Sequence, residues 1–525
     1  MDLSIQFILA ILPMLLIFIG LVLFRKSGTL MSVVGWVLTV IIAVFFFQTS
    51  ASVALAASWD GVLSSFGISL MVLFSILQVT MMDVTGAISS ITAYIKTVAA
   101  ERYEQIMILN VGFGTFLVSI GATPVTMLPP IMLALGFSPI AAVALPCLGY
   151  DPLTSFSLLA VPITLPASVF GLDVRALGIT VAWFLPVIST GIALAMLWVA
   201  DGIAGVKKGF VTALVAGLTL GLCAILFVHI LPPAAIGLVG VFSGLVTVVV
   251  ILLMRKIRGR PLDVAEPAAI QAAKEERKGK MPLWKAALPW VVLVLFCIVI
   301  SIPVIKSGLP SILGNMQKIP VMADQIVNLN LLSQAYFWVL ISTLVTAPLL
   351  IRSKDEVGKI TKLWLKRAWS PTLAAMVFFA IAYVMDWSGK SVSNGALTLA
   401  PAALNMNMVI GLVLALIFGV AFPLFSPMLG LFGSFVAGSE TSSNVMFYGI
   451  IKKSTDVLNL NFLQVYSAHL VAGGIASGVA VAKIINAAAV VDKLGIEGEV
   501  VRKLAPVAII LTLITGVMLV MMLYL

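Results

Sequence analysis

The sequence predicts an all-α membrane protein that crosses the bilayer many times, and three observations lead to this prediction. Only 10% of its 525 residues are charged and 61% are hydrophobic, whereas soluble proteins keep roughly a quarter of their residues charged. Apolar runs of about 20 residues, each long enough to span a bilayer as a helix, recur along the chain. No stretch long enough for a soluble domain separates them. The net charge of +10 therefore indicates basic cytoplasmic loops and not nucleic-acid binding.

The apolar runs predict a series of spanning helices joined by short loops. Two longer regions, Ala122–Gly171 and Leu458–Val491, are interrupted by Pro, Gly and polar residues. These two regions predict broken or re-entrant helices, which gives about 12 to 14 membrane elements in total. The predicted continuous spans are Ile5–Phe24, Leu30–Gln48, Gly61–Met82, Gln105–Gly121, Ala176–Val199, Phe210–Ile230, Ala234–Met254, Ala286–Ile305, Gln334–Ile351, Pro371–Met385, Val409–Leu424 and Leu504–Leu525.

Basic residues predict the orientation of these spans, because cytoplasmic loops carry an excess of Lys and Arg. The first apolar run is followed, not preceded, by basic residues 25–26, which predicts a retained span and not a cleaved signal peptide. The basic loops 255–285 and 352–367 are also expected in the cytoplasm. Counting from residue 25 places the N-terminus outside. The basic pair 502–503 before the last span places the C-terminus outside as well.

One long hydrophilic loop divides the chain into two membrane halves. Residues 255–285 form the only long hydrophilic segment of the sequence, and they fall at its middle. We interpret this segment as a solvated connector on the cytoplasmic side. The expected organisation is an N-terminal membrane half, 1–254, the loop 255–285, and a C-terminal membrane half, 286–525.

A short sequence repeat relates the two halves. Residues 113–126 read FGTFLVSIGATPVT and residues 432–445 read FGSFVAGSETSSNV, and each stretch follows an apolar span. A polar turn that re-enters apolar sequence predicts a helical hairpin, tolerated only where it is buried in protein or lines a watery cavity. We expect hairpins near 113–137 and 426–451, and the opposite directions of the preceding spans predict two inverted repeats. Paired interruptions of this kind indicate the substrate site of a transporter.

Glu440 is the most conspicuous residue of the second hairpin. A carboxylate within apolar membrane sequence is costly unless it is paired, solvated or protonated. Burial disfavours the charged form of a carboxyl, so Glu440 would take up and release a proton and couple it to transport. The structural alternative is that Glu440 caps the helix that begins at the next residues, because acids favour helix N-termini. Both roles can hold together.

Hydroxyl and amide side chains next to each hairpin tip predict contacts with an anion. Free N–H groups and the dipole at the start of a half-helix favour an anionic ligand. The alternative is that these side chains cap the turn or bond to their own helix. The predicted substrate-binding residues are Thr441, Ser442, Ser443 and Asn444 in the second hairpin, with Ser119, Thr123 and Thr126 in the first.

Two charged residues lie within the interrupted regions. Asp151, in LGYDPLTSFS, is surrounded by hydroxyls, and proton or cation coordination is one interpretation while a plain polar kink is the other. We assign Asp151 to proton coupling together with Glu440. Lys483 is a possible counter-charge for the substrate, or a side chain that snorkels to the membrane interface.

The sequence offers little for an enzyme, a metal site or a pore. Cys147, Cys223 and Cys297 are scattered through apolar segments with no metal or redox spacing, and only two His residues exist. We therefore expect no metal and no cofactor. A membrane-embedded enzyme lacks a nucleophile–base set, and two polar turns suit an occludable site better than the continuous pore of a channel.

The stretch LFSPMLGLFGSFVAGSETSSNV, residues 424–445, resembles the L-lactate permease family, proton-coupled importers of lactate and glycolate in bacteria and archaea. PVTMLPPIMLALGFSPIAA in the first half and VAGGIASG in the second are similar to other segments of that family. The resemblance implies that two hairpins handle a substrate carboxylate with a symported proton, in the plasma membrane of a prokaryote. It departs at residues 118–124, where the acid of the family's first hairpin is missing.

We therefore expect a secondary active transporter of a small monocarboxylate such as L-lactate or glycolate, working by proton symport. Sodium coupling is the alternative, with Asn444, Glu440 and backbone carbonyls of the broken helices as oxygen ligands. The expected partners are a small organic anion and the lipid bilayer, and the sequence leaves the oligomeric state open.

Overall fold

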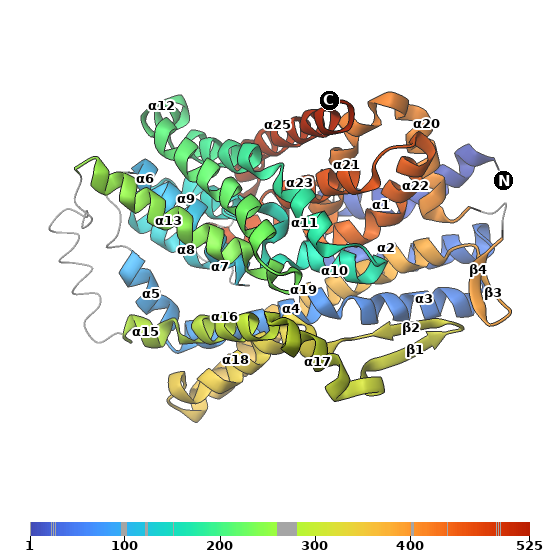
Figure 1. Ribbon diagram of the computed structural model, residues 1–525, viewed down its shortest axis with the longest axis horizontal. Helices are drawn as coiled ribbons and strands as arrows, with labels where there is room; N and C mark the ends of the chain where they lie inside the picture. Colours follow the sequence, from blue (N-terminus) through green and yellow to red (C-terminus); the bar gives the residue numbers. More distant parts are fainter. Residues whose placement is uncertain are drawn as a thin grey trace.

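The structure is a computed structural model, and it confirms an all-α protein with many membrane spans (Figure 1). Helices dominate because a backbone in lipid must satisfy its hydrogen bonds internally, and the described part of the chain adds only two short β-hairpins. Eight helical runs among the described residues are long and apolar enough to cross a bilayer. The structure describes the whole chain apart from residues 1, 23, 25, 27, 96–101, 121–123, 151, 260–280, 401–403, 438, 490, 492 and 494.

The N-terminal half alternates long apolar helices with short, interrupted ones. The short helices lie around the predicted first hairpin and the interrupted region after it. A π-helical turn, Met107–Phe113, separates α6 from α7. The helices are α1 (Leu3–Val22), α2 (Gly28–Phe46), α3 (Ala51–Ser64), α4 (Phe66–Val84), α5 (Ala87–Ile95), α6 (Arg102–Ile106), α7 (Gly114–Ser119), α8 (Pro124–Ala134), α9 (Pro139–Leu148), α10 (Val161–Phe170), α11 (Val174–Ala182), α12 (Leu185–Ile230) and α13 (Val239–Ile257).

Helix α12 is too long for one span because it is folded back on itself. Asp201 and Gly202 depart from helical geometry, and Gly202 has a φ of +63°, which glycine adopts without a steric penalty. Beyond this turn the second arm packs against the first, since a side chain added at Gly217 would meet the backbone of Thr190. Small residues at such contacts let membrane helices approach closely. The predicted span Phe210–Ile230 is the second arm, whereas the predicted span Ala176–Val199 is divided between α11 and the first arm.

The C-terminal half contains the longest unbroken helices and both hairpins of β-structure. The predicted span Val409–Leu424 is wrong as one helix, because Gly419 with a φ of +48° ends α20 and a new helix carries the chain on to Ala437. The elements are α15 (Leu283–Ala286), α16 (Leu288–Ser301), α17 (Pro303–Leu313), β1 (Lys318–Met322), β2 (Gln325–Asn328), α18 (Ala335–Leu350), α19 (Lys354–Trp387), β3 (Lys390–Ser393), β4 (Ala396–Leu399), α20 (Met406–Phe418), α21 (Phe422–Ala437), α22 (Glu440–Leu458), α23 (Phe462–Ser477), α24 (Val481–Ala489) and α25 (Glu497–Tyr524).

Helices from the two halves of the sequence pack against each other. Helices α2, α3 and α4 contact α19, and α4 also contacts α18, so blue and yellow ribbons lie side by side in Figure 1. Hydrogen bonds join them: the buried Gln78 amide donates to Ser342 Oγ at 2.8 Å, and the partly buried Trp364 indole donates to the Leu73 carbonyl at 2.8 Å. The two halves therefore form one packed unit.

The two ends of the long axis differ in chemistry. The basic C-terminal end of α13 and the helix α15 lie at one end, while the N-terminus and both β-hairpins lie at the other (Figure 1). The hairpins contact each other through Asp324, whose carboxylate accepts a hydrogen bond from the Leu397 N–H at 3.0 Å. Hydrogen bonds from the Gln325 side chain and from Leu397 hold the pKa of Asp324 below its usual range.

Candidate functional site

The chain between α9 and α10 is an irregular segment in the protein interior. Thr154, Leu158, Leu159 and Ala160 all have positive φ values, from +42° to +56°. Side chains other than glycine rarely adopt this geometry, and strain of this kind concentrates at functional sites. We call residues 149–160 the first break. Asp151 belongs to it by sequence and lies outside the described residues.

Glu440 is the first residue of α22 and is buried, with 6% of its surface exposed. Ser439 caps the helix, since its hydroxyl accepts a hydrogen bond from the Ser442 N–H at 3.4 Å. Glu440 itself reaches across to the first break, where the Ser155 hydroxyl donates to Glu440 Oε1 at 2.5 Å. The acid of the second half thus meets a hydroxyl of the first half, 285 residues away in sequence.

A pair of glycines in α23 allows this meeting. A Cβ added at Gly473 would lie 2.8 Å from Ser434 Oγ and 3.3 Å from Glu440 Cγ. A Cβ added at Gly474 would lie 2.7 Å from the Cα of Thr154 in the first break. Real Cβ atoms essentially never come within 3.0 Å of such atoms, so only glycine lets α23 lie this close to the first break and to α21, and its contact with Glu440 of α22 is also tight.

Asn444 ties the same helix to its neighbours. The Asn444 side-chain amide donates to the Pro162 carbonyl in α10 at 3.0 Å, and the Asn444 backbone carbonyl accepts a hydrogen bond from the Tyr466 hydroxyl at 2.8 Å. His469, the next turn along α23, is fully buried between the rings of Phe447 and Tyr466. Helices α10, α22 and α23 are therefore held together at Asn444, one turn along α22 from Glu440.

Several buried polar atoms in this region have no hydrogen-bond partner among the described residues. Buried polar groups are nearly always satisfied, so an unsatisfied cluster indicates a place where a ligand or water is accepted. The hydroxyls would donate to a carboxylate and the amide oxygen would accept from a hydroxyl or a cation. These atoms are Thr154 Oγ1, Ser434 Oγ, Ser442 Oγ, Ser443 Oγ, Asn444 Oδ1 and Ser467 Oγ.

Lys483 lies close to the same break. Its ammonium is 3.9 Å from the centre of the Tyr150 ring and donates a hydrogen bond to the Ser477 hydroxyl at the end of α23. A cation over an aromatic ring is stabilised by the ring's negative face. The Lys483 ammonium thus contacts Tyr150 of the first break, and the buried Glu440 carboxylate contacts Ser155 of the same break.

Ser119, the described side chain among the predicted residues of the first hairpin, lies elsewhere. The Ser119 hydroxyl donates to the Thr115 carbonyl in its own helix at 2.7 Å and faces Gly240 of α13. Thr123 lies outside the described residues, as does the side chain of Thr126. The structure brings Glu440, Thr441, Ser442, Ser443 and Asn444 together at the start of α22, and Lys483 to the neighbouring break. It does not bring Ser119 to them.

The sequence interpretation did not assign a role to Ser155, Gly473 or Gly474. Ser155 was visible only as part of a hydroxyl-rich stretch around Asp151, and the glycine pair only as the segment VAGGIASG. The contacts that these residues make depend on how the two halves of the sequence pack, which no local sequence pattern reports.

Comparison with known proteins places the chain among permeases. The model of the L-lactate permease family matches residues 6–525. An L-lactate permease from Streptococcus iniae is 24% identical over 462 residues, covering 87% of this chain and 92% of the relative. The glycolate permease GlcA of Escherichia coli K12 is 23% identical over 554 residues, with 98% and 95% covered. An L-lactate permease of Bacillus subtilis is 24% identical over 536 residues, with 94% and 91% covered.

Proposed function

This chain belongs to the L-lactate permease family, and from this premise we propose that it is a secondary transporter of a small monocarboxylate such as L-lactate or glycolate, driven by proton symport. It acts in the plasma membrane of a prokaryote. The relatives named above are permeases for these two acids, which differ from each other by one methyl group. A transporter and not an enzyme is the class that both the family and the composition support.

The observation that carries the proposal is the hydrogen bond between Ser155 and Glu440. It joins the tip of the predicted second hairpin to the first break, inside the protein and among unsatisfied hydroxyls. The substrate carboxylate binds these hydroxyls and the N–H groups at the start of α22, where the helix dipole favours an anion. Lys483 supplies a counter-charge at the edge of the site.

Coupling follows from the electrostatics of two carboxylates at close range. An ionised Glu440 and a substrate carboxylate repel each other, so they cannot both be charged in one dry site. A proton on Glu440 removes the repulsion and makes the occupied site electrically equivalent to the empty ionised one. Proton and anion therefore bind and cross together, and the transport step moves no net charge.

The packing of the hairpins supports an inverted repeat around this site. Helix α22 of the predicted second hairpin contacts the first break through Glu440 and Ser155, while helix α8 of the predicted first hairpin contacts α24, within the interrupted region of the second half. Each hairpin meets the interrupted region of the other half. Alternating access then results from movement of the hairpin-bearing elements against the rest.

Sodium is the second candidate for the coupling ion. Asn444 Oδ1 is a buried oxygen without a hydrogen-bond partner among the described residues, and it lies near Glu440 across Gly473. Oxygen atoms of this kind are the ligands that hard cations prefer. The experiment below therefore imposes proton and sodium gradients separately.

The test is uptake of labelled L-lactate and glycolate into proteoliposomes that contain the purified protein. We expect concentrative uptake under an inward proton gradient and none under a sodium gradient at equal pH. Glu440→Gln removes the titratable acid and keeps the shape of the side chain, so this variant should exchange lactate but no longer accumulate it. Glu499→Gln, at an exposed position of α25, is the matched control and should behave as wild type. Uptake that ignores both gradients would show that the protein is no symporter.

A further inference from the structure

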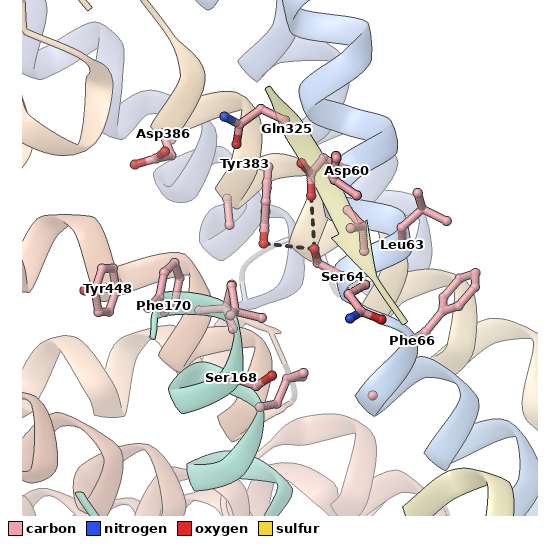
Figure 2. A pocket seen from close by; sticks show the side chains of 18 of the residues that line it. Asp60, Leu63, Ser64, Phe66, Ser168, Phe170, Gln325, Tyr383, Asp386 and Tyr448 are labelled. Atoms are coloured by element: carbon pink, nitrogen blue, oxygen red, sulfur yellow. Dashed lines mark hydrogen bonds between the residues drawn. The ribbon is translucent and has the colours of Figure 1, made fainter. Parts of the chain in front are cut away.

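A second polar region lies apart from Glu440, at a cavity of about 420 Å³ between α3, α10, α19, α22 and β2. Figure 2 shows its lining side chains, with Asp60 and Ser64 from α3 opposite Tyr383 from α19. The cavity also includes Asn328 and Gln325 of β2, so it lies on the side of the β-hairpins.

Asp60 is the centre of a hydrogen-bonded chain in this cavity. It is buried, with 5% of its surface exposed, although it belongs to a spanning helix. The Ser64 hydroxyl donates to Asp60 Oδ1 at 3.0 Å, and the Tyr383 hydroxyl lies 2.9 Å from Ser64 Oγ. Because Ser64 gives its proton to Asp60, Tyr383 is the donor of the second bond. Two hydroxyls in series thus end on one carboxylate (Figure 2).

No cation among the described lining residues is left over to neutralise Asp60. The charged groups that face it are Asp386 and Lys390, and these two form an ion pair with each other at 2.8 Å. The other titratable groups of the cavity are the phenols Tyr383 and Tyr448, which are neutral. The lining therefore carries one excess negative charge when Asp60 is ionised. An ionised acid buried in a spanning helix is costly unless it is paired with a cation or becomes protonated.

An independent observation points the same way. Asn407 lines the cavity and is buried, and its Oδ1 has no hydrogen-bond partner among the described residues. A cavity with an excess acid and an unsatisfied acceptor favours a proton or a cation and disfavours an anionic substrate.

We propose that Asp60 is a second proton-binding site of the transporter, which takes up the coupling proton on the side of the β-hairpins. The inference rests on the proposed symport. The Asp60 carboxylate accepts one proton from a hydronium ion, which leaves as water, and Ser64 and Tyr383 hold the carboxyl group in place. Helix α22 connects the two sites, because it carries Glu440 in its first turn and lines the cavity with Tyr448 and Gly449.

The experiment compares two transport modes in proteoliposomes for wild type, Asp60→Asn and the control Glu499→Gln, an exposed acid of α25 outside the cavity. Accumulation under an inward proton gradient requires a proton-binding site, whereas lactate exchange at equal pH does not. We expect Asp60→Asn to lose accumulation by about tenfold or more while its exchange rate stays within about twofold of wild type. Glu499→Gln should keep both activities.

Other outcomes overturn the proposal. Equal loss of exchange and accumulation in Asp60→Asn would assign it a structural role, and unchanged accumulation would assign it none. A response to sodium that disappears in Asp60→Asn would make the cavity a sodium site. If this variant does not fold, Tyr383→Phe, which removes only a hydroxyl, must slow accumulation more than exchange. If the wild-type protein does not respond to a proton gradient, the proposed symport itself is wrong. This outcome differs from a failure of the Asp60 proposal, in which wild type still responds to the gradient.

Discussion

The hydrogen bond between Ser155 and Glu440 is a single contact on which two parts of the site depend. Glu440 has one oxygen engaged by a hydroxyl from the other half of the sequence, and that hydroxyl sits on strained backbone next to Thr154 with its φ of +42°. A hydrogen bond to a charged group contributes about 1.5–3 kcal/mol. Because the bond exists only while the first break and α22 are in contact, it stabilises one arrangement of the site over others.

Replacement of Ser155 tests this contact. We expect Ser155→Ala to lower the rate of proton-driven lactate uptake about tenfold or more, as the loss of about 1.5–3 kcal/mol implies. Ser155→Thr keeps the hydroxyl and should retain most of the rate. Ser157→Ala removes a half-buried hydroxyl from the same break and is the control. Initial rates at several lactate concentrations separate an effect on KM from one on the maximal rate. Equal rates for Ser155→Ala and Ser157→Ala would contradict the assigned role.

Among the helices, α23 is the element on which the site is assembled. It packs against α21, α22, α25 and the first break, and its Gly473 and Gly474 are the points of closest approach. A helix of small residues gains little from hydrophobic burial and much from close packing. The same contacts would be lost with one added methyl group.

We therefore expect Gly474→Ala to destabilise the protein by about 1–3 kcal/mol, because the new methyl would overlap the backbone of Thr154. Gly358→Ala, in α19, is the control, since a Cβ there meets nothing within 4 Å and alanine favours a helix by about 1 kcal/mol. Thermal unfolding of both variants in detergent should show opposite shifts of the midpoint. A Gly474→Ala variant as stable as wild type would mean that α23 does not approach the break this closely.

A second packing contact lies at the basic end of the molecule, where α6 meets α13. Glu104 and Arg255 form an ion pair there with side chains only 1% exposed. A buried pair is weak evidence for stability, yet removal of one partner leaves an uncompensated charge that costs about 3–5 kcal/mol. The pair therefore holds α6 against α13 mainly because breaking it carries this cost, and less because of the attraction between the two charges.

Glu104→Gln should accordingly lower the unfolding free energy by about 3–5 kcal/mol. The matched control is Asp83→Asn, which breaks an exposed ion pair with Arg367 at 3.2 Å and should cost no more than about 1 kcal/mol. Chemical or thermal denaturation of the three proteins in the same detergent measures the difference. Similar losses for the two variants would show that the first pair is solvated in the folded protein.

At the scale of the whole molecule, hydropathy predicted the class of fold and most of the spans. The arms of α12 and the long helices α13 and α25 lie within the apolar runs of the sequence. An apolar segment in lipid forms a helix because a helix satisfies all its backbone hydrogen bonds within the segment. Helix breaks that depend on a single glycine, such as the break at Gly419 between α20 and α21, were not predicted. The hairpins and the inverted repeat stay predictions.

The site could be predicted only in part, for a physical reason. Glu440 stands out because an acid in apolar sequence is costly wherever it packs. Ser155 does not stand out, because its role comes from a partner 285 residues away. Asp60 immediately precedes the predicted span Gly61–Met82, and the sequence analysis assigned it no role. Helix α3 begins at Ala51 instead, and α19 buries the acid.

The distribution of charge along the long axis bears on orientation. Arg255 and Lys256 end α13, and Lys354 begins α19, whereas the N-terminus and both β-hairpins lie at the other end (Figure 1). Cytoplasmic loops carry the basic excess, so we infer that the β-hairpins and the N-terminus face the outside. The same reasoning places the cavity at Asp60 toward the outside, where the proton gradient of a respiring cell supplies protons.

Single cysteines at the two ends test this orientation in intact cells. In a variant whose three native cysteines are replaced by alanine, Ser393→Cys in β3 should react with a membrane-impermeant maleimide. Lys359→Cys near the start of α19 should react only after the cells are permeabilised; both positions are exposed, so burial does not limit either reaction. The reverse pattern would turn the molecule over in the membrane and place Asp60 on the cytoplasmic side, where it would release protons and not collect them. Reaction of both cysteines from outside would contradict the separation of the two ends across the bilayer.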